Sequence, residues 1–194
     1  MNIINGFEKS KSFLSSNRYI NLTSDSILES SKMVFGESLD AHSYVQKIVN
    51  QVRDNGDTAI KNLVLKIEGN EVNDFVIKQH KLEAAYNRIP KNLQKALTLS
   101  SERITKFHQK SMPKSWYDES EGYGQNFIPV NSVGAYIPGG TAKYPSTVLM
   151  STIPAKIAGV KNISITCPMN FEGNIPDSVL AAAYIAEVDK VYGV

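Results

Sequence analysis

The sequence is poor in cysteine and has no long apolar run. Its one cysteine, Cys167, excludes an intramolecular disulfide framework and any all-cysteine metal cluster. No stretch approaches the ~18 consecutive apolar residues that a membrane-spanning helix requires. The first residues also lack the apolar core of a secretory signal. We therefore expect a cytoplasmic protein of a reducing compartment, with no membrane partner.

An excess of either charge sign is missing as well. The 194 residues include 21 Lys plus Arg and 19 Asp plus Glu, which gives a net charge of +2. This balance speaks against nucleic acid as a partner, because domains that bind it carry a basic excess. The composition is that of an ordinary globular protein, long enough for one large or two small domains.

Glycine is scarce before residue 120, and this scarcity divides the sequence. Four of the 12 glycines lie in residues 1–119 and eight in residues 120–194, which predicts a mainly helical first region and an α/β second region. In the first region, apolar spacing predicts a helix that ends at Gly56 and a second helix that begins at once. A short strand is predicted at residues 74–78, and Pro90 favours the start of a long helix.

The second region alternates strands and helices. Its apolar patterns predict an α/β fold in the order β-α-β-α-β, with the helix starts marked by Pro145 and by Asp177 as an N-cap. Short connections in this order favour a right-handed parallel sheet of the doubly wound kind. The predicted strands and helices cover residues 133–137, 145–158, 162–166, 177–185 and 188–192.

The predicted sheet is small. It contains about three parallel strands, fewer than the usual sheet of five or six. The last of them is terminal and a candidate for an edge position, which is a poor stopping point for an independent domain. We therefore interpret the sequence as a piece of a longer protein.

The strongest local signal for ligand binding is a strand that ends in a proline-glycine-glycine turn before a helix. Gly139 and Gly140 can adopt positive φ and let a ligand approach the backbone. Amides at the helix start, near Ser146, would favour an anion, and Tyr136 could stack on a flat ligand. The turn is not the G-x-G-x-x-G fingerprint, so a tight connection in an ordinary α/β sheet stays open as an alternative.

The whole string around this turn carries more information than its glycines. It is VGAYIPGGTAKYPSTVLMSTIPAKIAGV, and it resembles the signature of the histidinol dehydrogenase family. The resemblance continues downstream through Cys167-Pro168 and upstream through a helix pair around Gly56, and it covers essentially residues 24–194.

The resemblance implies an activity, cofactors and site residues. Members of the family oxidise L-histidinol to L-histidine, the last steps of histidine biosynthesis, with two NAD and a bound zinc. They are intertwined homodimers with Rossmann-like sheets, so this chain would hold a helical region and an incomplete Rossmann-like sheet. By resemblance Tyr136 contacts NAD, Pro138, Gly139 and Gly140 lie beside that site, and Ser146 lies close to substrate.

The resemblance also implies what this chain lacks. The family's zinc ligands, its catalytic glutamate–histidine pair and its further NAD contacts belong to later segments, so the chain alone is expected to be inactive. Ser111 and the Ala186-Glu187-Val188 segment depart from the usual family residues. The alternative is a non-catalytic remnant of the same fold that binds a nucleotide or dimerises.

Other candidates carry less chemistry. His42, His80 and His108 are dispersed without metal-ligand spacing, so no zinc site is expected within the chain. Cys167 ends a strand, where a nucleophile could stand, but a packed, inert thiol is the favoured interpretation. Trp116 could anchor a partner, although core packing is the more usual role of such a residue.

Overall fold

The computed structural model describes residues 4–16, 24–69, 71–139, 142–170 and 173–194. The chain separates into two compact units, residues 1–67 and residues 68–194. This division differs from the compositional one near residue 120, because the helices that precede residue 120 pack with those that follow it. No described helix is both long enough and apolar enough to cross a bilayer.

The first unit is helical. Its elements are α1 (Phe7–Ser16), α2 (Asp25–Phe35) and α3, which runs from Ala41 to Glu68. Gly56 interrupts α3 with φ 54° and ψ −137°, so the predicted helix end at this glycine is confirmed. At the start of α3, the Asp40 carboxylate accepts hydrogen bonds from the backbone amides of His42 and Ser43, both at 3.0 Å. These bonds satisfy helix-end donors that would otherwise lack partners.

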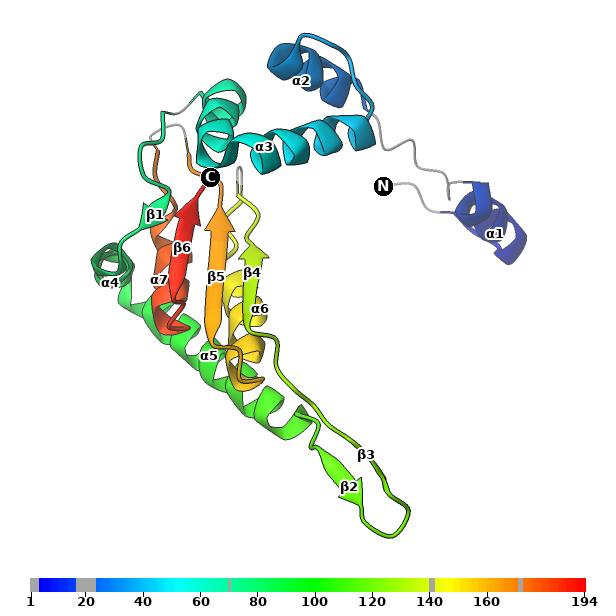
Figure 1. The fold of residues 1–194 in the computed structure, drawn as a ribbon, viewed down its shortest axis with the longest axis vertical. Coiled ribbons are helices and arrows are strands. Elements are labelled where there is room, and N and C mark those ends of the chain that lie inside the picture. Colours follow the sequence, from blue (N-terminus) through cyan, green and yellow to red (C-terminus); the bar gives the residue numbers. More distant parts are fainter. Residues whose placement is uncertain (1–3, 17–23, 70, 140–141, 171–172) are drawn as a thin grey trace. The chain divides into compact units, whose positions relative to one another are not determined.

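The second unit holds a four-stranded sheet, its covering helices and a separate hairpin (Figure 1). The sheet contains β1 (Val76–Ile77), β4 (Ser132–Tyr136), β5 (Asn162–Cys167) and β6 (Lys190–Gly193). The helices are α4 (Gln79–Arg88), α5 (Lys91–Ser111), α6 (Pro145–Ile157) and α7 (Asp177–Ile185). The hairpin pairs β2 (Trp116–Asp118) with β3 (Tyr123–Gln125). Strands β4, β5 and β6 are parallel neighbours, which confirms the predicted β-α-β-α-β order.

The last strand is not at an edge of the described sheet. The strand order is β1-β6-β5-β4, and β1 pairs antiparallel with β6, Val76 lying opposite Tyr192. The candidate edge position for the last strand was therefore wrong, because a strand from far upstream covers it. Sequence spacing could not show this pairing, since 116 positions separate the two residues.

One expectation about the helices also needs correction. A doubly wound sheet carries helices on both faces, but α5, α6 and α7 all lie behind the same face in Figure 1. The reason is the strand order: successive right-handed crossovers that proceed in one direction, β4 to β5 to β6, place their helices on one side. None of the helices described in residues 68–194 lies on the opposite face, which we call the open face.

The core lies between the sheet and these helices. In β5 the residues alternate, so that Ile163, Ile165 and Cys167 are buried while Ser164 and Thr166 are half-buried. The fully enclosed side chains around them come from the residue after β4 and from α6, α7 and β6: Ile137, Val148, Leu149, Val179 and Val191. This alternation fits a sheet with one apolar face and one polar face.

Polar contacts hold the rim of this core. Arg88 of α4 donates to both carboxylate oxygens of Asp177, at 2.9 and 2.6 Å. Tyr86 of α4 packs on Tyr184 of α7 with ring centroids 5.2 Å apart. Asp177 was predicted as the N-cap of its helix, but the cap position is Pro176, and the Asp177 carboxylate binds Arg88 instead.

Candidate functional site

Tyr136 stands at the carboxyl end of β4 on the open face. Its side chain is 64% exposed, whereas Ile137, the next residue, is fully buried on the opposite side. The register places Tyr136 opposite Thr166, and Thr166 opposite Tyr192. The three side chains therefore form one row across three strands, because residues paired in register project to the same face.

The turn after this strand is held by packing. The Ile137 amide donates to the Thr166 carbonyl at 2.8 Å, so pairing with β5 continues to the last residue before Pro138. Pro138 is exposed, and Gly139 is half-buried. A Cβ added to Gly139 would lie 2.4 Å from Cγ of Pro168, inside the closest approach of real atoms. A side chain at this position is excluded by the Pro168 ring.

This contact changes the reason why a glycine is required at position 139, and it does not bear on Gly140. Glycine at position 139 was noted because it can adopt positive φ, but Gly139 is not among the positive-φ residues, and the contact with Pro168 makes its requirement steric. Gly140, the second glycine of the turn, lies outside the described residues.

Helix α6 begins at the same end of the sheet without a side-chain cap. Its N-cap residue, Tyr144, makes no capping hydrogen bond, and its first turn contains no acidic residue. The Thr147 amide donates to the Tyr144 carbonyl at 3.1 Å, and Ser146 is exposed. An uncapped helix start has amide donors and a partial positive charge, which together favour an anion.

Sequence reasoning found Tyr136 but missed its neighbours on the sheet. Thr166 and Tyr192 share its row, and Gly134 leaves open space on the same face, with no atom within 4 Å of a Cβ there. The alternation of β5, Asn-Ile-Ser-Ile-Thr-Cys, was the available signal for Thr166. Nothing local marked Pro168 as the partner of Gly139, because 29 positions separate the two.

Cys167 is an ionisable side chain buried in the core cluster. It is 1% exposed, so the packed environment expected for it is confirmed. Burial, and secondarily the charge of Glu68, raise the pKa of the Cys167 thiol to about 11. Burial also raises the pKa of the Glu68 carboxyl. A thiol that stays protonated at neutral pH is a poor nucleophile.

The histidines do not assemble a metal site. Among the described residues there is no group of three or more His, Cys, Asp or Glu side chains that could hold a metal ion. A structural or catalytic zinc needs at least three protein ligands. The described part of this chain therefore does not fit a zinc ion by itself.

Comparison with known proteins identifies relatives of this chain. A family model described as histidinol dehydrogenase matches residues 35–194. The histidinol dehydrogenase of Prochlorococcus marinus is 39% identical over 166 residues, which are 84% of this chain and 39% of that protein. That of Lactiplantibacillus plantarum is 42% identical over 159 residues, 80% of this chain and 37% of that protein.

A solved structure agrees with these sequence matches. The crystal structure of histidinol dehydrogenase from Elizabethkingia anophelis superimposes with a TM-score of 0.76 at 26% identity, covering 86% of this chain and 40% of that one. The chain thus spans less than half the length of the relatives it matches. On the family match and these likenesses, it belongs to the histidinol dehydrogenase family.

Proposed function

We propose that this chain supplies the N-terminal part of an enzyme that oxidises L-histidinol to L-histidine, and that its share of the active site is one wall of the NAD pocket. The observation that carries the proposal is the exposure of Tyr136 at the carboxyl end of β4, where α6 begins without a cap. Ligands of open parallel sheets bind beyond the carboxyl ends of the strands.

Each residue of this wall has a proposed role. Tyr136 stacks on, or hydrogen-bonds to, a planar part of the coenzyme. Pro138 and Gly139 shape the floor beside it, and Pro168 fixes the position of Gly139 by its contact with that residue. Gly140, which lies outside the described residues, is assigned to the coenzyme by resemblance alone. The first amides of α6 face the coenzyme phosphates, and Ser146 contacts substrate. NAD, when bound, accepts the hydride that leaves the alcohol carbon.

The remaining chemistry is proposed to come from other segments of the enzyme. Zinc and an acid–base pair are the family's means of handling the alcohol proton, and the described residues contain no donor set for the metal. A homodimer in the cytoplasm completes the proposal.

An activity assay tests whether the catalytic groups lie in other segments of the enzyme. The purified chain, incubated with zinc, NAD and L-histidinol, is expected to produce no NADH above background. Turnover above background would contradict the assignment of the catalytic groups to other segments.

A binding assay tests the coenzyme wall itself. In ligand-observed NMR with NAD, we expect saturation transfer to the coenzyme from the unaltered chain and its loss in Tyr136→Ala. Tyr117→Ala is the matched control, because Tyr117 is similarly exposed at 68% and lies on the hairpin. Equal transfer in all three proteins would refute the role of Tyr136.

A second candidate is a non-catalytic module that pairs with a full-length relative or binds a nucleotide. The mainly helical N-terminal region is the feature that favours it. Native mass spectrometry of this chain mixed with an intact family member would detect the heterodimer that this candidate requires. If the chain neither associates with the relative nor binds a nucleotide, this candidate is eliminated.

A further inference from the structure

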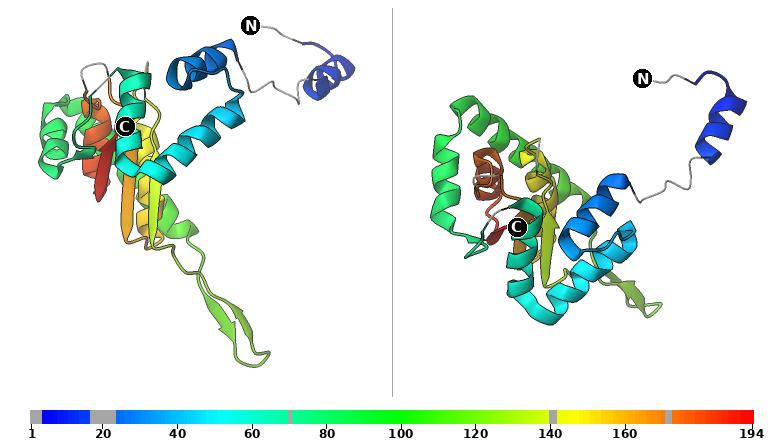
Figure 2. Two further views of the ribbon diagram at one scale, coloured as in Figure 1. Left: turned by 45° about the horizontal axis from the view of Figure 1, so that its top comes forward. Right: turned by 90° about the horizontal axis from the view of Figure 1, so that it is seen from above.

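The carboxyl ends of β4, β5 and β6 lie along one edge of the sheet, which we call the carboxyl edge. The strand arrows point to this edge in Figure 1, and it faces the viewer in the right-hand view of Figure 2. Helices α6 and α7 begin on this side, because each follows a strand that ends here. Strand β1 enters the sheet here as well, since the Phe75 carbonyl accepts a hydrogen bond of 2.9 Å from the Gly193 amide.

Two buried polar atoms near this edge have no hydrogen-bond partner among the described residues. They are Oε2 of Glu68 and Oγ of Ser178. Ser178 lies in the first turn of α7. Glu68 is the last residue of α3 and the first of the second unit, seven positions before Phe75. Buried polar atoms are rarely left unpaired in native proteins, so each is a candidate contact for a ligand.

Glu68 lies near the end of β5. Burial is the larger cause of the raised pKa of the Cys167 thiol, and the charge of Glu68 is the second, which places the carboxylate near the last residue of β5. Oε2 of Glu68 is enclosed, whereas the side chain as a whole is only half-buried. Burial raises the pKa of the Glu68 carboxyl, and no cation or donor in the described part of the chain opposes that shift. The carboxylate therefore has acceptor capacity left for a ligand that supplies donors.

The order of the elements indicates which donors these are. Strand β4, helix α6 and strand β5 form a β-α-β unit, and α6 begins without a cap. In dinucleotide-binding folds, the pyrophosphate lies at the start of the first helix, and a carboxylate farther along the unit accepts a hydrogen bond from the adenosine ribose. The described residues directly after β5 are Pro168, Met169 and Asn170, which carry no carboxylate. Glu68 supplies one at this position from another part of the chain.

A cation lies on the phosphate side of the same edge. Lys143 is exposed just before α6. The pKa of the Asp177 carboxyl is lowered first by Arg88 and also by Lys143, so Lys143 lies near the start of α7 as well. The carboxyl edge thus has a positive group by the helix starts and a negative group by the end of β5. This arrangement complements a ligand that carries phosphates next to a hydroxylated sugar.

We propose that Glu68 accepts hydrogen bonds from the 2′- and 3′-hydroxyls of the adenosine ribose, and that it makes this chain select NAD over NADP. The 2′-phosphate of NADP would bring further negative charge against a half-buried carboxylate, and like charges repel. The inference rests on the proposed function, because it needs the coenzyme at the carboxyl edge. It adds the residue that contacts the sugar.

Titrations of the full chain with NAD and with NADP, followed by ligand-observed NMR, test the inference. The unaltered chain should bind NAD at least ~10-fold more tightly than NADP, because only NAD leaves the ribose hydroxyls free for charge-assisted hydrogen bonds. Glu68→Gln keeps the size of the side chain and removes its charge, so NAD binding should weaken ~10-fold. NADP binding should weaken less or improve. The preference for NAD should therefore largely disappear.

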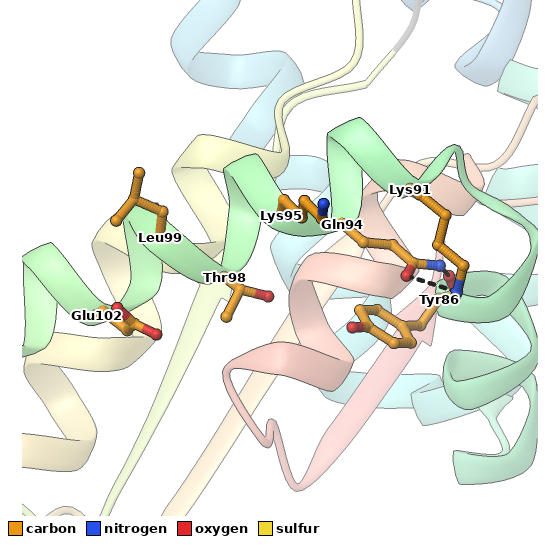
Figure 3. A pocket seen from close by; sticks show the side chains of 7 residues that line it. All are labelled: Tyr86, Lys91, Gln94, Lys95, Thr98, Leu99 and Glu102. Carbon is orange, nitrogen blue, oxygen red and sulfur yellow. Dashed lines mark hydrogen bonds between the residues drawn. The ribbon is translucent and has the colours of Figure 1, made fainter.

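Two other glutamates provide controls. Glu102 is an exposed carboxylate of α5 that lines a hollow with Tyr86 and Thr98 (Figure 3). Glu102→Gln removes the same charge from the same unit and should leave the preference for NAD unchanged. Glu172 follows β5 by five positions and lies outside the described residues. Loss of the preference in Glu172→Gln, with the preference retained in Glu68→Gln, would overturn the role of Glu68.

Folding of each variant needs a separate measurement. Trp116, the only tryptophan, is 51% exposed on β2, so the core position expected for it was wrong and its fluorescence is a poor report on the core. Far-UV circular dichroism and urea denaturation are used instead. Glu68→Asp retains the charge on a shorter side chain, so it should still prefer NAD over NADP even where its affinity for both falls.

The outcomes separate this inference from the proposed function. If the chain binds NAD and Glu68→Gln keeps the full preference over NADP, Glu68 does not contact the ribose, and the coenzyme wall at Tyr136 stands. If the unaltered chain binds NAD and NADP equally, the selective role of Glu68 is refuted while NAD binding is upheld. If the chain binds neither coenzyme, the proposed function fails and this inference fails with it.

Discussion

The two faces of the four-stranded sheet differ in how far their side chains are exposed. On the covered face, Ile165 and Val191 are each 1% exposed beneath α6 and α7. On the open face, Tyr136 is 64% exposed beside half-buried Thr166 and Tyr192. Adjacent residues of the same strand thus have different roles: those on the covered face pack in the core and stabilise the fold, and those on the open face can contact a ligand.

The comparison predicts opposite outcomes for neighbouring substitutions. Ile165→Ala should lower the free energy of unfolding by about 2–5 kcal/mol, because it removes buried methyl groups and leaves a cavity. Tyr136→Ala, on the open face, should change it by less than about 0.5 kcal/mol. Urea denaturation measures both values. Similar losses at the two positions would show that the open face also supports the fold.

Two glycines of the same strand and turn sharpen the contrast. Gly139→Ala should destabilise the protein by about 1–3 kcal/mol, because the new Cβ meets the Pro168 ring and either the turn or the proline must shift. At Gly134 a Cβ meets no atom within 4 Å and φ is not positive, so Gly134→Ala should be neutral or slightly stabilising.

Thermal unfolding of the two alanine variants separates them. Equal midpoints would contradict the steric role assigned to Pro168. Gly139→Ala should in addition weaken NAD binding more than Gly134→Ala does, because only the first change displaces the turn beside Tyr136.

Local signals were enough for the elements of the fold and for the position of the turn. Apolar spacing predicted the helix break at Gly56, where the structure has a positive φ, and the alternating strands and helices after residue 130. These features depend on neighbours within a few positions of one another. The string around Tyr136 also sufficed to identify the family.

Long-range contacts were beyond reach. The antiparallel pairing of β1 with β6, the wedge of Pro168 against Gly139 and the ion pair of Arg88 with Asp177 each join segments at least 29 positions apart. The exposure of Trp116 is similar, because a tryptophan pattern gives no information on which surface will cover it. The helices lie on one face because the crossovers from β4 to β5 and from β5 to β6 proceed in the same direction along the sheet. That direction depends on the order of the strands, which composition and local patterns do not give.

Cys167 provides a pH-dependent test of the covered face. Its thiol pKa is raised to about 11 in the folded protein, above the usual 9.0. The folded state therefore holds the proton more tightly, so this contribution is fully present below pH 9 and is lost as pH rises toward 11. Chemical denaturation across this range should show a steeper loss of stability in the unaltered chain than in Cys167→Ala.

Thiol modification gives a second measurement of the same property. At pH 8, iodoacetamide should react with Cys167 much more slowly in the folded chain than in urea. Rapid reaction in the folded state would contradict the enclosure of this thiol in the core.

The rim of the covered face should contribute least. Arg88 and Asp177 form an exposed pair that links α4 to α7, and Arg88 holds the pKa of the Asp177 carboxyl below its usual range. Exposed ion pairs are weak because water and salt screen them. Stability from this pair is present above the usual carboxyl pKa and is lost as pH falls through the lowered one. A double-mutant cycle with Arg88→Gln and Asp177→Asn should give a coupling free energy smaller than the loss of stability expected for Ile165→Ala or Gly139→Ala. That coupling should vanish in high salt. A large, salt-insensitive coupling would instead place this pair, rather than the apolar layer under Ile165, among the main supports of the covered face.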